Sequence, residues 1–171
     1  SDLGAQTNLV PNPSFENYSN CPTSLSDITA ATPWESPTLG TPDYFNACSP
    51  NTPSFSANVP YNFMGYQQAH SGIGYAGFEL AGKCSECDDD TKEYIQVKLM
   101  DSLKINHNYC VSFFLNLSDS CAYAINDVGI FFSTKKQYNY TTYNHLPFNP
   151  QIKDINYVTD TTNWVEYSQS F

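Results

Sequence analysis

The chain has 171 residues and a formal net charge of -10, with 7 Lys and Arg against 17 Asp and Glu. This length fits one domain with its own core. The charge excludes nucleic acid as a partner, because phosphate binding depends on Lys and Arg, and it disfavours anionic membrane surfaces for the same reason. A neutral partner or a cation such as calcium is compatible with it. No apolar run approaches the roughly 20 residues of a membrane-spanning helix, so no direct membrane insertion is expected.

The composition favours strands and turns. The chain contains 13 Tyr and 11 Phe, whereas charged residues make up only 14% of it. Aromatic residues favour strands, and the abundant Asn, Ser, Pro and Gly favour turns. The composition therefore predicts an all-β, loop-rich, secreted protein.

In chain order, residues 1–6 are expected to be a signal-peptide remnant or a plain N-terminal tail, and residues 7–171 a single domain. The region 22–62 is rich in proline, contains Cys48 and directly follows Cys21, which predicts a long loop system held by a disulfide. Alternating apolar and polar residues then predict strands. The predicted strands are residues 74–80, 93–99, 108–117, 127–133 and 163–171.

Strands with one apolar face predict two packed antiparallel sheets. We therefore expect a β-sandwich, and more specifically a jelly roll of the galactose-binding-like type with long loops. The last predicted strand includes Phe171, which favours a sandwich truncated at its C-terminal strand.

Six cysteines indicate disulfides formed in an oxidising compartment. The C-x-x-C motif at 84–87 is typical of a tight structural disulfide, a redox centre or half of a zinc site. A redox motif needs a βαβ context and a zinc site needs a second ligand pair, and neither is evident, so the disulfide is favoured. Cys110 and Cys121 flank a short segment, and the remaining two cysteines pair by elimination. The predicted pairs are Cys21–Cys48, Cys84–Cys87 and Cys110–Cys121.

Several motifs carry a family resemblance. NLVPNPSFE at 8–16, HSGIGYAGFEL at 70–80 and the tryptophan of ATPWESP resemble jelly-roll carbohydrate-binding modules of the family 4/9/22 type. With TPDYFNAC, VPYNFMGYQ, EYIQV and DTTNWV in order, the chain is more similar still to surface proteins of Bacteroidetes bacteria. There the module often precedes an OmpA-like peptidoglycan-binding domain or a type IX secretion sorting domain. The resemblance implies a secreted or outer-membrane-associated protein of the bacterial cell surface.

The resemblance also implies a structural calcium. In the related modules the Glu of the Phe-Glu pair binds this ion together with backbone carbonyls and an Asp of the last strand. By position Glu16 would be the carboxylate ligand, and the carbonyl of Gly74 would contribute as well. Calcium prefers 6–8 oxygen ligands, and the closing Asp would lie beyond Phe171. The alternative is that Glu16 caps a turn or pairs with a lysine.

Loop aromatics are the predicted binding groups, because flat rings pack on sugar faces while amides and carboxylates bond the hydroxyl rim. The candidate ligand-binding residues are Trp34, Asp43, Tyr44, Tyr61, Phe63, Tyr66 and Gln67. Catalysis is not expected, since no GxSxG motif and no distinctive carboxylate pair is present. The sequence predicts a non-catalytic module that binds glycan or mediates adhesion. The alternative is a structural or assembly module that binds cell-surface protein partners.

Overall fold

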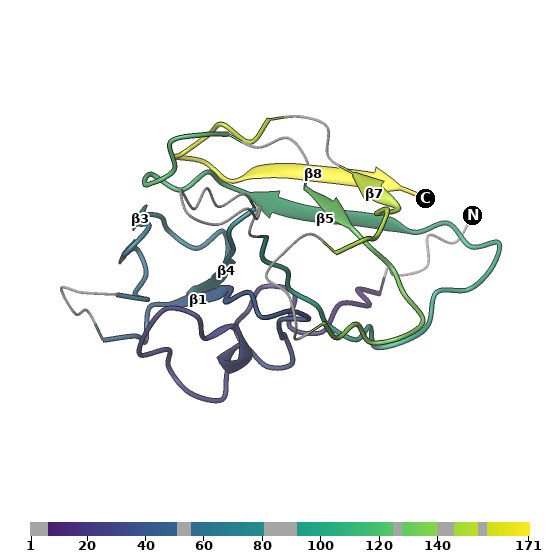
Figure 1. The fold of residues 1–171 in the computed structure, drawn as a ribbon, viewed down its shortest axis with the longest axis horizontal. Coiled ribbons are helices and arrows are strands. Elements are labelled where there is room, and N and C mark those ends of the chain that lie inside the picture. The colour runs from purple at the N-terminus through teal and green to yellow at the C-terminus, as the bar shows by residue number, and fades with distance from the viewer. Residues whose placement is uncertain (1–6, 51–55, 81–91, 125–127, 140–145, 154–156) are drawn as a thin grey trace.

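The computed structural model describes residues 7–50, 56–80, 92–124, 128–139, 146–153 and 157–171 (Figure 1). Within these residues, eight strands form four separate antiparallel pairs, and one turn of 3-10 helix, η1 (Ile28–Ala30), is the only helical element. This confirms the all-β prediction. No helix in the described part of the chain is long and apolar enough to cross a bilayer.

The core is built around β1 (Asp43–Asn46), which pairs with β4 (Gly74–Gly77). Successive side chains of a strand point to opposite faces, so Tyr44 and Phe45 enter different apolar clusters. Tyr44 packs with Ala30, Ala31 and Phe15, and Phe45 packs with Ala57, Val59, Leu25, Met64, Ala69 and Tyr75. Both faces of β1 are therefore covered.

A short hairpin follows, formed by β2 (Tyr61–Asn62) and β3 (Gly65–Tyr66). Asn62 starts the turn, because its Oδ1 accepts the N–H of Met64 at 2.9 Å. Gly65 has φ +126°, and a Cβ there would lie 2.6 Å from the Cβ of Asp119. Glycine is thus required both by the backbone conformation and by the close approach of a neighbouring segment.

The longest pair joins β5 (Cys110–Leu115) to β8 (Val165–Ser170). Both strands lie inside predicted ranges, and Phe113 and Tyr167 stack across the pair with ring centroids 5.8 Å apart. The fourth pair, β6 (Gly129–Ile130) and β7 (Ile152–Lys153), has only two residues in each strand.

The strand predicted at 93–99 is wrong. Only an isolated bridge forms there, between Gln96 and Glu35, whose backbones exchange hydrogen bonds of 3.1 and 2.8 Å. The Gln96 side chain bonds the backbone of Gln137, and the Tyr94 hydroxyl accepts the N–H of Leu146 at 3.0 Å. The backbone of this segment bonds Glu79 through the N–H of Glu93 at 2.7 Å and Glu35 at Gln96, so it meets different segments in turn and forms no continuous ladder.

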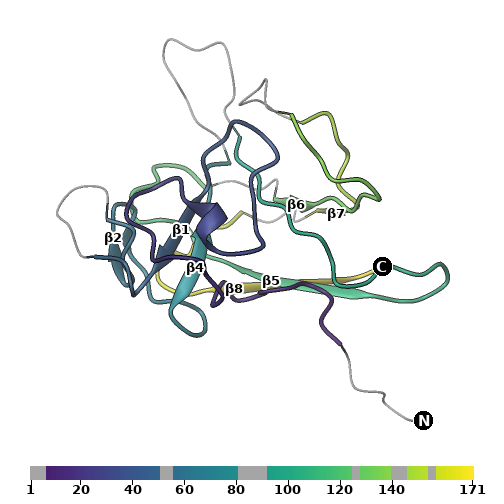
Figure 2. The same ribbon diagram turned by 90° about the horizontal axis from the view of Figure 1, so that it is seen from below.

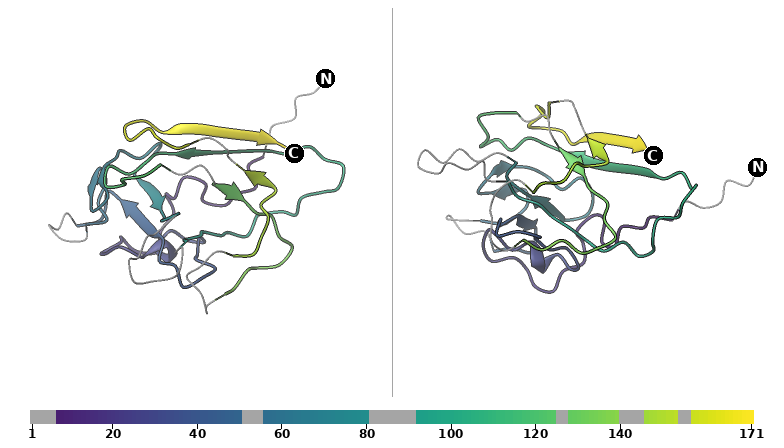
Figure 3. Two further views of the ribbon diagram at one scale, coloured as in Figure 1. Left: turned by 45° about the horizontal axis from the view of Figure 1, so that its top comes forward. Right: turned by 45° about the vertical axis from the view of Figure 1, so that its right-hand side comes forward.

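The β5–β8 pair lies on one side of the β1–β4 pair. It runs above β1 and β4 in Figure 1, and Figure 3 shows the same separation from two other directions. Figure 2, seen from below, shows β1 and β4 toward one end of the β5–β8 pair. Ring contacts join the levels: Tyr75 meets Trp164 edge-on at 5.4 Å, and His70 stacks on Phe114 at 3.6 Å. In the described residues the strands form four pairs rather than two continuous sheets, so the jelly-roll sandwich stays a prediction.

Candidate ligand-binding site

The carboxylate of Glu16 holds the turn that precedes β4. Its Oε1 accepts hydrogen bonds from the backbone N–H groups of Ile73 at 2.9 Å and Gly74 at 3.0 Å. Gly72 has φ +64°, and a Cβ at this position would collide with the carboxylate. The glycine of the HSG motif therefore provides the backbone conformation that brings two N–H groups to one oxygen.

These contacts give Glu16 a structural role of its own, and the calcium site stays a prediction. N–H donors occupy the Glu16 oxygen, and Gly74 presents its N–H to the carboxylate although its carbonyl was the expected ligand. Among the described residues, no group of three or more His, Cys, Asp or Glu side chains could hold a metal ion. A calcium ion needs 6–8 oxygen ligands. The contacts match the alternative reading, in which Glu16 caps a turn.

The prediction that Tyr44 contacts a ligand is wrong. Its side chain is 0% exposed, because β1 is covered on both faces. The hydroxyl donates to the carbonyl of Phe15 at 2.7 Å and accepts a hydrogen bond from Nδ2 of Asn46 at 2.7 Å. Burial raises the pKa of Tyr44 to about 12. The tyrosine links the N-terminal motif to the central strand.

Two other candidates also make internal contacts. The Nε1–H of the half-buried Trp34 donates to the carbonyl of Asn12 at 2.9 Å, and its ring packs against Phe15 at 5.1 Å. The Oδ1 of Asp43 accepts the N–H of Ser26 at 2.6 Å, and burial raises the pKa of Asp43 to about 6. Trp34 and Asp43 thus position loops, and neither is among the residues that line the groove described below.

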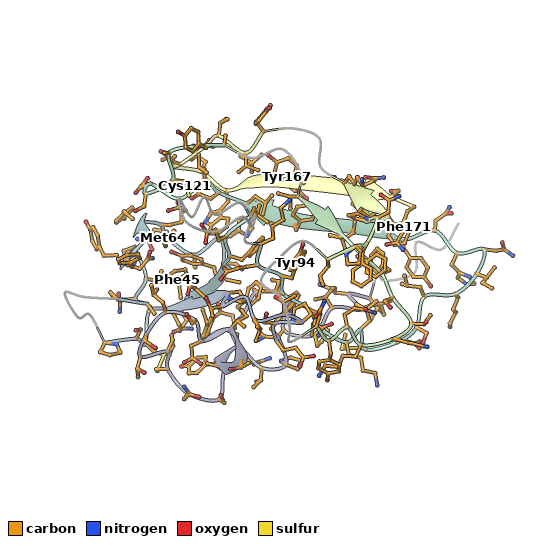
Figure 4. The ribbon with its side chains drawn as sticks, viewed as in Figure 1. Phe45, Met64, Tyr94, Cys121, Tyr167 and Phe171 are labelled. Carbon is orange, nitrogen blue, oxygen red and sulfur yellow. A yellow bond between two sulfur atoms is a disulfide. The ribbon has the colours of Figure 1, made fainter. Side chains whose placement is uncertain are left out.

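The structure contains the predicted disulfide Cys21–Cys48, which joins two parts of the proline-rich region. The predicted pair Cys110–Cys121 is wrong, because both are free, exposed thiols. Cys110 begins β5, Cys121 follows its other end, and six strand residues span roughly 17 Å. In Figure 4, Cys121 lies near Met64 at one end of the β5–β8 pair. Phe171 lies at the other end, and it directly follows Ser170, the strand partner of Cys110. A disulfide requires Cα atoms within about 7 Å. Cys84–Cys87 lies outside the described residues.

The remaining candidates converge on the β2–β3 hairpin. Tyr61 is 62% exposed, Phe63 is 56% exposed and Tyr66 is 46% exposed. Tyr61 and Tyr66 are partners in the strand register, with ring centroids 4.8 Å apart and ring planes at 69°. Gln67 follows directly, and its N–H donates to the carbonyl of Pro60 at 2.8 Å across the base of the hairpin. We call Tyr61, Phe63 and Tyr66 the aromatic hairpin.

A neighbouring segment supports the aromatic hairpin from one side. The Ser118 hydroxyl donates to the carbonyl of Met64 at 2.7 Å, and the Oδ2 of Asp119 accepts the N–H of Tyr66 at 2.9 Å. Hydrogen bonds to a charged acceptor are stronger than neutral ones. The backbone of the hairpin is therefore fixed before any ligand arrives.

Two further bonds connect the aromatic hairpin to the strands of both levels. Nδ2 of Asn62 donates to the hydroxyl of Tyr75 on β4 at 2.7 Å, and burial raises the pKa of this tyrosine to about 12. The Nε1–H of Trp164, next to β8, donates to the carbonyl of Gln68 at 2.8 Å. The hairpin thus keeps one orientation relative to β4 and β8.

A polar groove of about 190 Å³ opens beside Tyr66. Its lining residues are Tyr66, Gln67, Gln68, Asp119, Thr161 and Thr162. Nε2 of Gln68 donates to the Tyr66 hydroxyl at 3.2 Å, which leaves the hydroxyl proton free to donate to a ligand. An aromatic wall beside hydroxyl, amide and carboxylate groups is the arrangement that binds small polar molecules.

A second cleft, of about 280 Å³, lies beside η1 and is less suited to ligand binding. None of its described lining residues is aromatic, and the one acidic side chain among them, Glu35, already pairs with Lys136 at 2.6 Å. The groove beside the aromatic hairpin combines apolar and polar contacts, and this cleft lacks the aromatic component.

Sequence reasoning missed the groove residues outside the hairpin segment. Asp119 is 53 residues from Tyr66 along the chain, and Thr161 and Thr162 lie close to β8. No local pattern marks these residues, since loop Asp and Thr are common. The late DTTNWV motif contains both threonines, and its resemblance to the related surface proteins is the one signal that singles out this segment.

Comparisons with protein-family models, curated proteins and solved structures found no significant match. The resemblance to Bacteroidetes surface modules therefore stays a prediction. The geometry of the aromatic hairpin and its groove is what supports a function for this chain.

Proposed function

We propose that this chain is a non-catalytic carbohydrate-binding module of a bacterial surface or secreted protein, and that the aromatic hairpin with its groove is the binding site. The observation that carries the proposal is the exposure of three neighbouring aromatic side chains, Tyr61, Phe63 and Tyr66, beside a polar groove. Clustered exposed apolar side chains rimmed by polar groups mark binding sites on soluble proteins.

The chemistry of the site suits a sugar. A tyrosine ring offers a flat apolar face to the C–H side of a sugar ring, and its hydroxyl bonds the rim. Gln67, Gln68, Asp119 and the two threonines supply further donors and acceptors within the groove. A ligand with alternating apolar and hydroxyl faces satisfies both kinds of group at once.

The rigid support of the site favours binding. Met64, Tyr66 and Gln68 all have backbone groups bonded by side chains from distant segments. Because the loop is ordered in advance, a ligand loses less binding free energy to immobilising it.

The proposal includes a jelly-roll sandwich as the architecture and an extracellular location. The β1–β4 and β5–β8 pairs at separate levels support the sandwich (Figure 3). The Cys21–Cys48 disulfide supports an oxidising compartment such as the cell exterior.

A glycan array tests the function. We expect wild-type protein to bind at least one polysaccharide, and Tyr61→Ala and Tyr66→Ala each to weaken binding about tenfold, the effect of losing about 1.4 kcal/mol. Tyr138→Ala is the matched control, since Tyr138 is 53% exposed but lies under the ammonium of Lys136, outside the groove. Circular dichroism confirms that each variant is folded.

The array distinguishes the alternatives. Binding that both hairpin variants reduce and the control does not would support the proposal. No binding across a broad array would contradict it and would shift the assignment to a structural module with a cell-surface protein as its partner.

A further inference from the structure

The ring geometry of the aromatic hairpin restricts the shape of the ligand. The Tyr61 and Tyr66 planes meet at 69° with centroids only 4.8 Å apart, so the two rings form a corner. Binding to a flat crystalline surface requires ring faces that lie in one plane. Tyr66 lines the groove and Tyr61 packs against it edge-to-face, so the pair offers no shared flat face and a sugar in the groove stacks on the Tyr66 ring.

The size of the groove gives the same restriction. Its volume is about 190 Å³, below the roughly 300–1,000 Å³ typical of pockets for drug-sized ligands. The groove is bounded by Gln67 and Gln68 on the hairpin side and by Thr161 and Thr162 on the other. A site of this size holds one sugar unit, with the rest of the glycan outside it.

The charge of the groove restricts the ligand further. Among the residues that the structure describes, Asp119 is the only charged one in the lining, which contains neither Lys nor Arg. Asp160 lies next to the lining threonines, and its Oδ1 accepts the N–H groups of Asn163 at 2.7 Å and Thr162 at 2.8 Å. These bonds lower the pKa of Asp160, which keeps its carboxylate ionised. An acidic sugar in the groove would face the carboxylate of Asp119, with that of Asp160 adjacent in the chain to the lining threonines, and would find no lining cation to pair with.

We infer that the site engages one sugar unit of a soluble, uncharged glycan, and that it rejects both acidic polysaccharides and flat insoluble ones. This inference rests on the proposed function. It follows from three observations. The ring planes of Tyr61 and Tyr66 meet at 69°, the groove has a volume of about 190 Å³, and the charged residue in its described lining is the acidic Asp119.

Affinity electrophoresis in native gels tests the charge class. The neutral probes are galactomannan and xyloglucan, and the acidic probes are alginate and polygalacturonate. We expect retardation by a neutral probe only, lost in Tyr66→Ala and kept in Tyr138→Ala. Asp119→Asn is expected to increase retardation by acidic probes relative to wild type, since it removes the only charge in the groove lining. Sedimentation with microcrystalline cellulose and chitin tests the insoluble class, where no depletion is expected.

Competition tests the single-unit site. We expect glucose, galactose or mannose to displace the retained polysaccharide with a molar affinity close to that of its own trisaccharide. An affinity that rises steeply with oligosaccharide length would overturn the inference. Binding to alginate, polygalacturonate, cellulose or chitin that depends on Tyr66 would also overturn the inference. Both of these results would leave the proposed carbohydrate-binding function in place. Loss of all tyrosine-dependent binding to every probe would overturn the function together with the inference.

Discussion

Replacing Asp43 by Asn should stabilise the protein near neutral pH and have little effect in acid. Burial raises the pKa of Asp43 from 3.8 to about 6, and nearby Glu93 adds a smaller upward contribution. One pKa unit corresponds to 1.36 kcal/mol, so ionised Asp43 destabilises the folded state by about 3 kcal/mol. The Asn side chain retains an oxygen that can accept the N–H of Ser26, so the substitution removes the charge and keeps the contact.

The sign of the pH dependence follows from the raised pKa. Below pH 3.8 Asp43 is protonated in both states, and its contribution to stability is fully present. As pH rises toward about 6, the unfolded state ionises while the folded state keeps its proton, and the free energy of unfolding falls. The advantage of Asp43→Asn over wild type should therefore grow from near zero to about 3 kcal/mol across this range.

Urea unfolding of both proteins between pH 3.5 and 8 measures this difference. Asp101→Asn is the matched control, because Asp101 is exposed and bonds only the adjacent N–H of Ser102. We expect the control to change stability by less than about 0.5 kcal/mol at any pH. An Asp43→Asn effect that is constant with pH, or destabilising above pH 6, would refute the reasoning.

Three further predictions concern the N-terminal half. Glu16→Ala should lower the free energy of unfolding by about 1.5–3 kcal/mol, the range for hydrogen bonds to charged groups. Glu16→Gln should lower it by less. A large drop in the melting temperature of the wild-type protein on adding EDTA would instead support the calcium site. Gly72→Ala should cost more than about 1 kcal/mol in urea unfolding, because it combines positive φ with a collision; a neutral effect would contradict the described turn. Replacing both Cys21 and Cys48 by Ala should cost about 3.5 kcal/mol, worked from a sequence separation of 27, and a loss near zero would show that the disulfide is not stabilising.

Alternation in the sequence predicted strands well where the apolar face meets a partner. β5, β8 and β4 all lie inside predicted ranges. The same pattern failed at 93–99, because the backbone there bonds Glu79 at Glu93 and Glu35 at Gln96, and no single neighbouring segment runs alongside it. Alternation of apolar and polar residues predicts an extended backbone. Whether that backbone forms a continuous row of hydrogen bonds with a neighbouring strand depends on residues distant in the sequence.

The site was predictable only in part, for a similar reason. The aromatic residues of VPYNFMGYQ lie together as expected from their spacing, and its turn residues keep Tyr61 and Tyr66 on an exposed hairpin. TPDYF also combines a proline with tyrosine and phenylalanine, yet Tyr44 is buried because β1 is covered on both faces. Composition identifies candidate aromatics, whereas exposure depends on how the remaining chain packs around each strand.

The bond from Trp164 to Gln68 joins residues 96 positions apart, which links the hairpin to the β8 end of the fold. The aromatic corner is therefore assembled only when both ends of the domain are in place. By mass action, a sugar that binds only this assembled form raises the free energy of global unfolding by RT ln(1 + [L]/Kd). Occupancy of a small surface groove would then slow hydrogen exchange in strands that never touch the sugar.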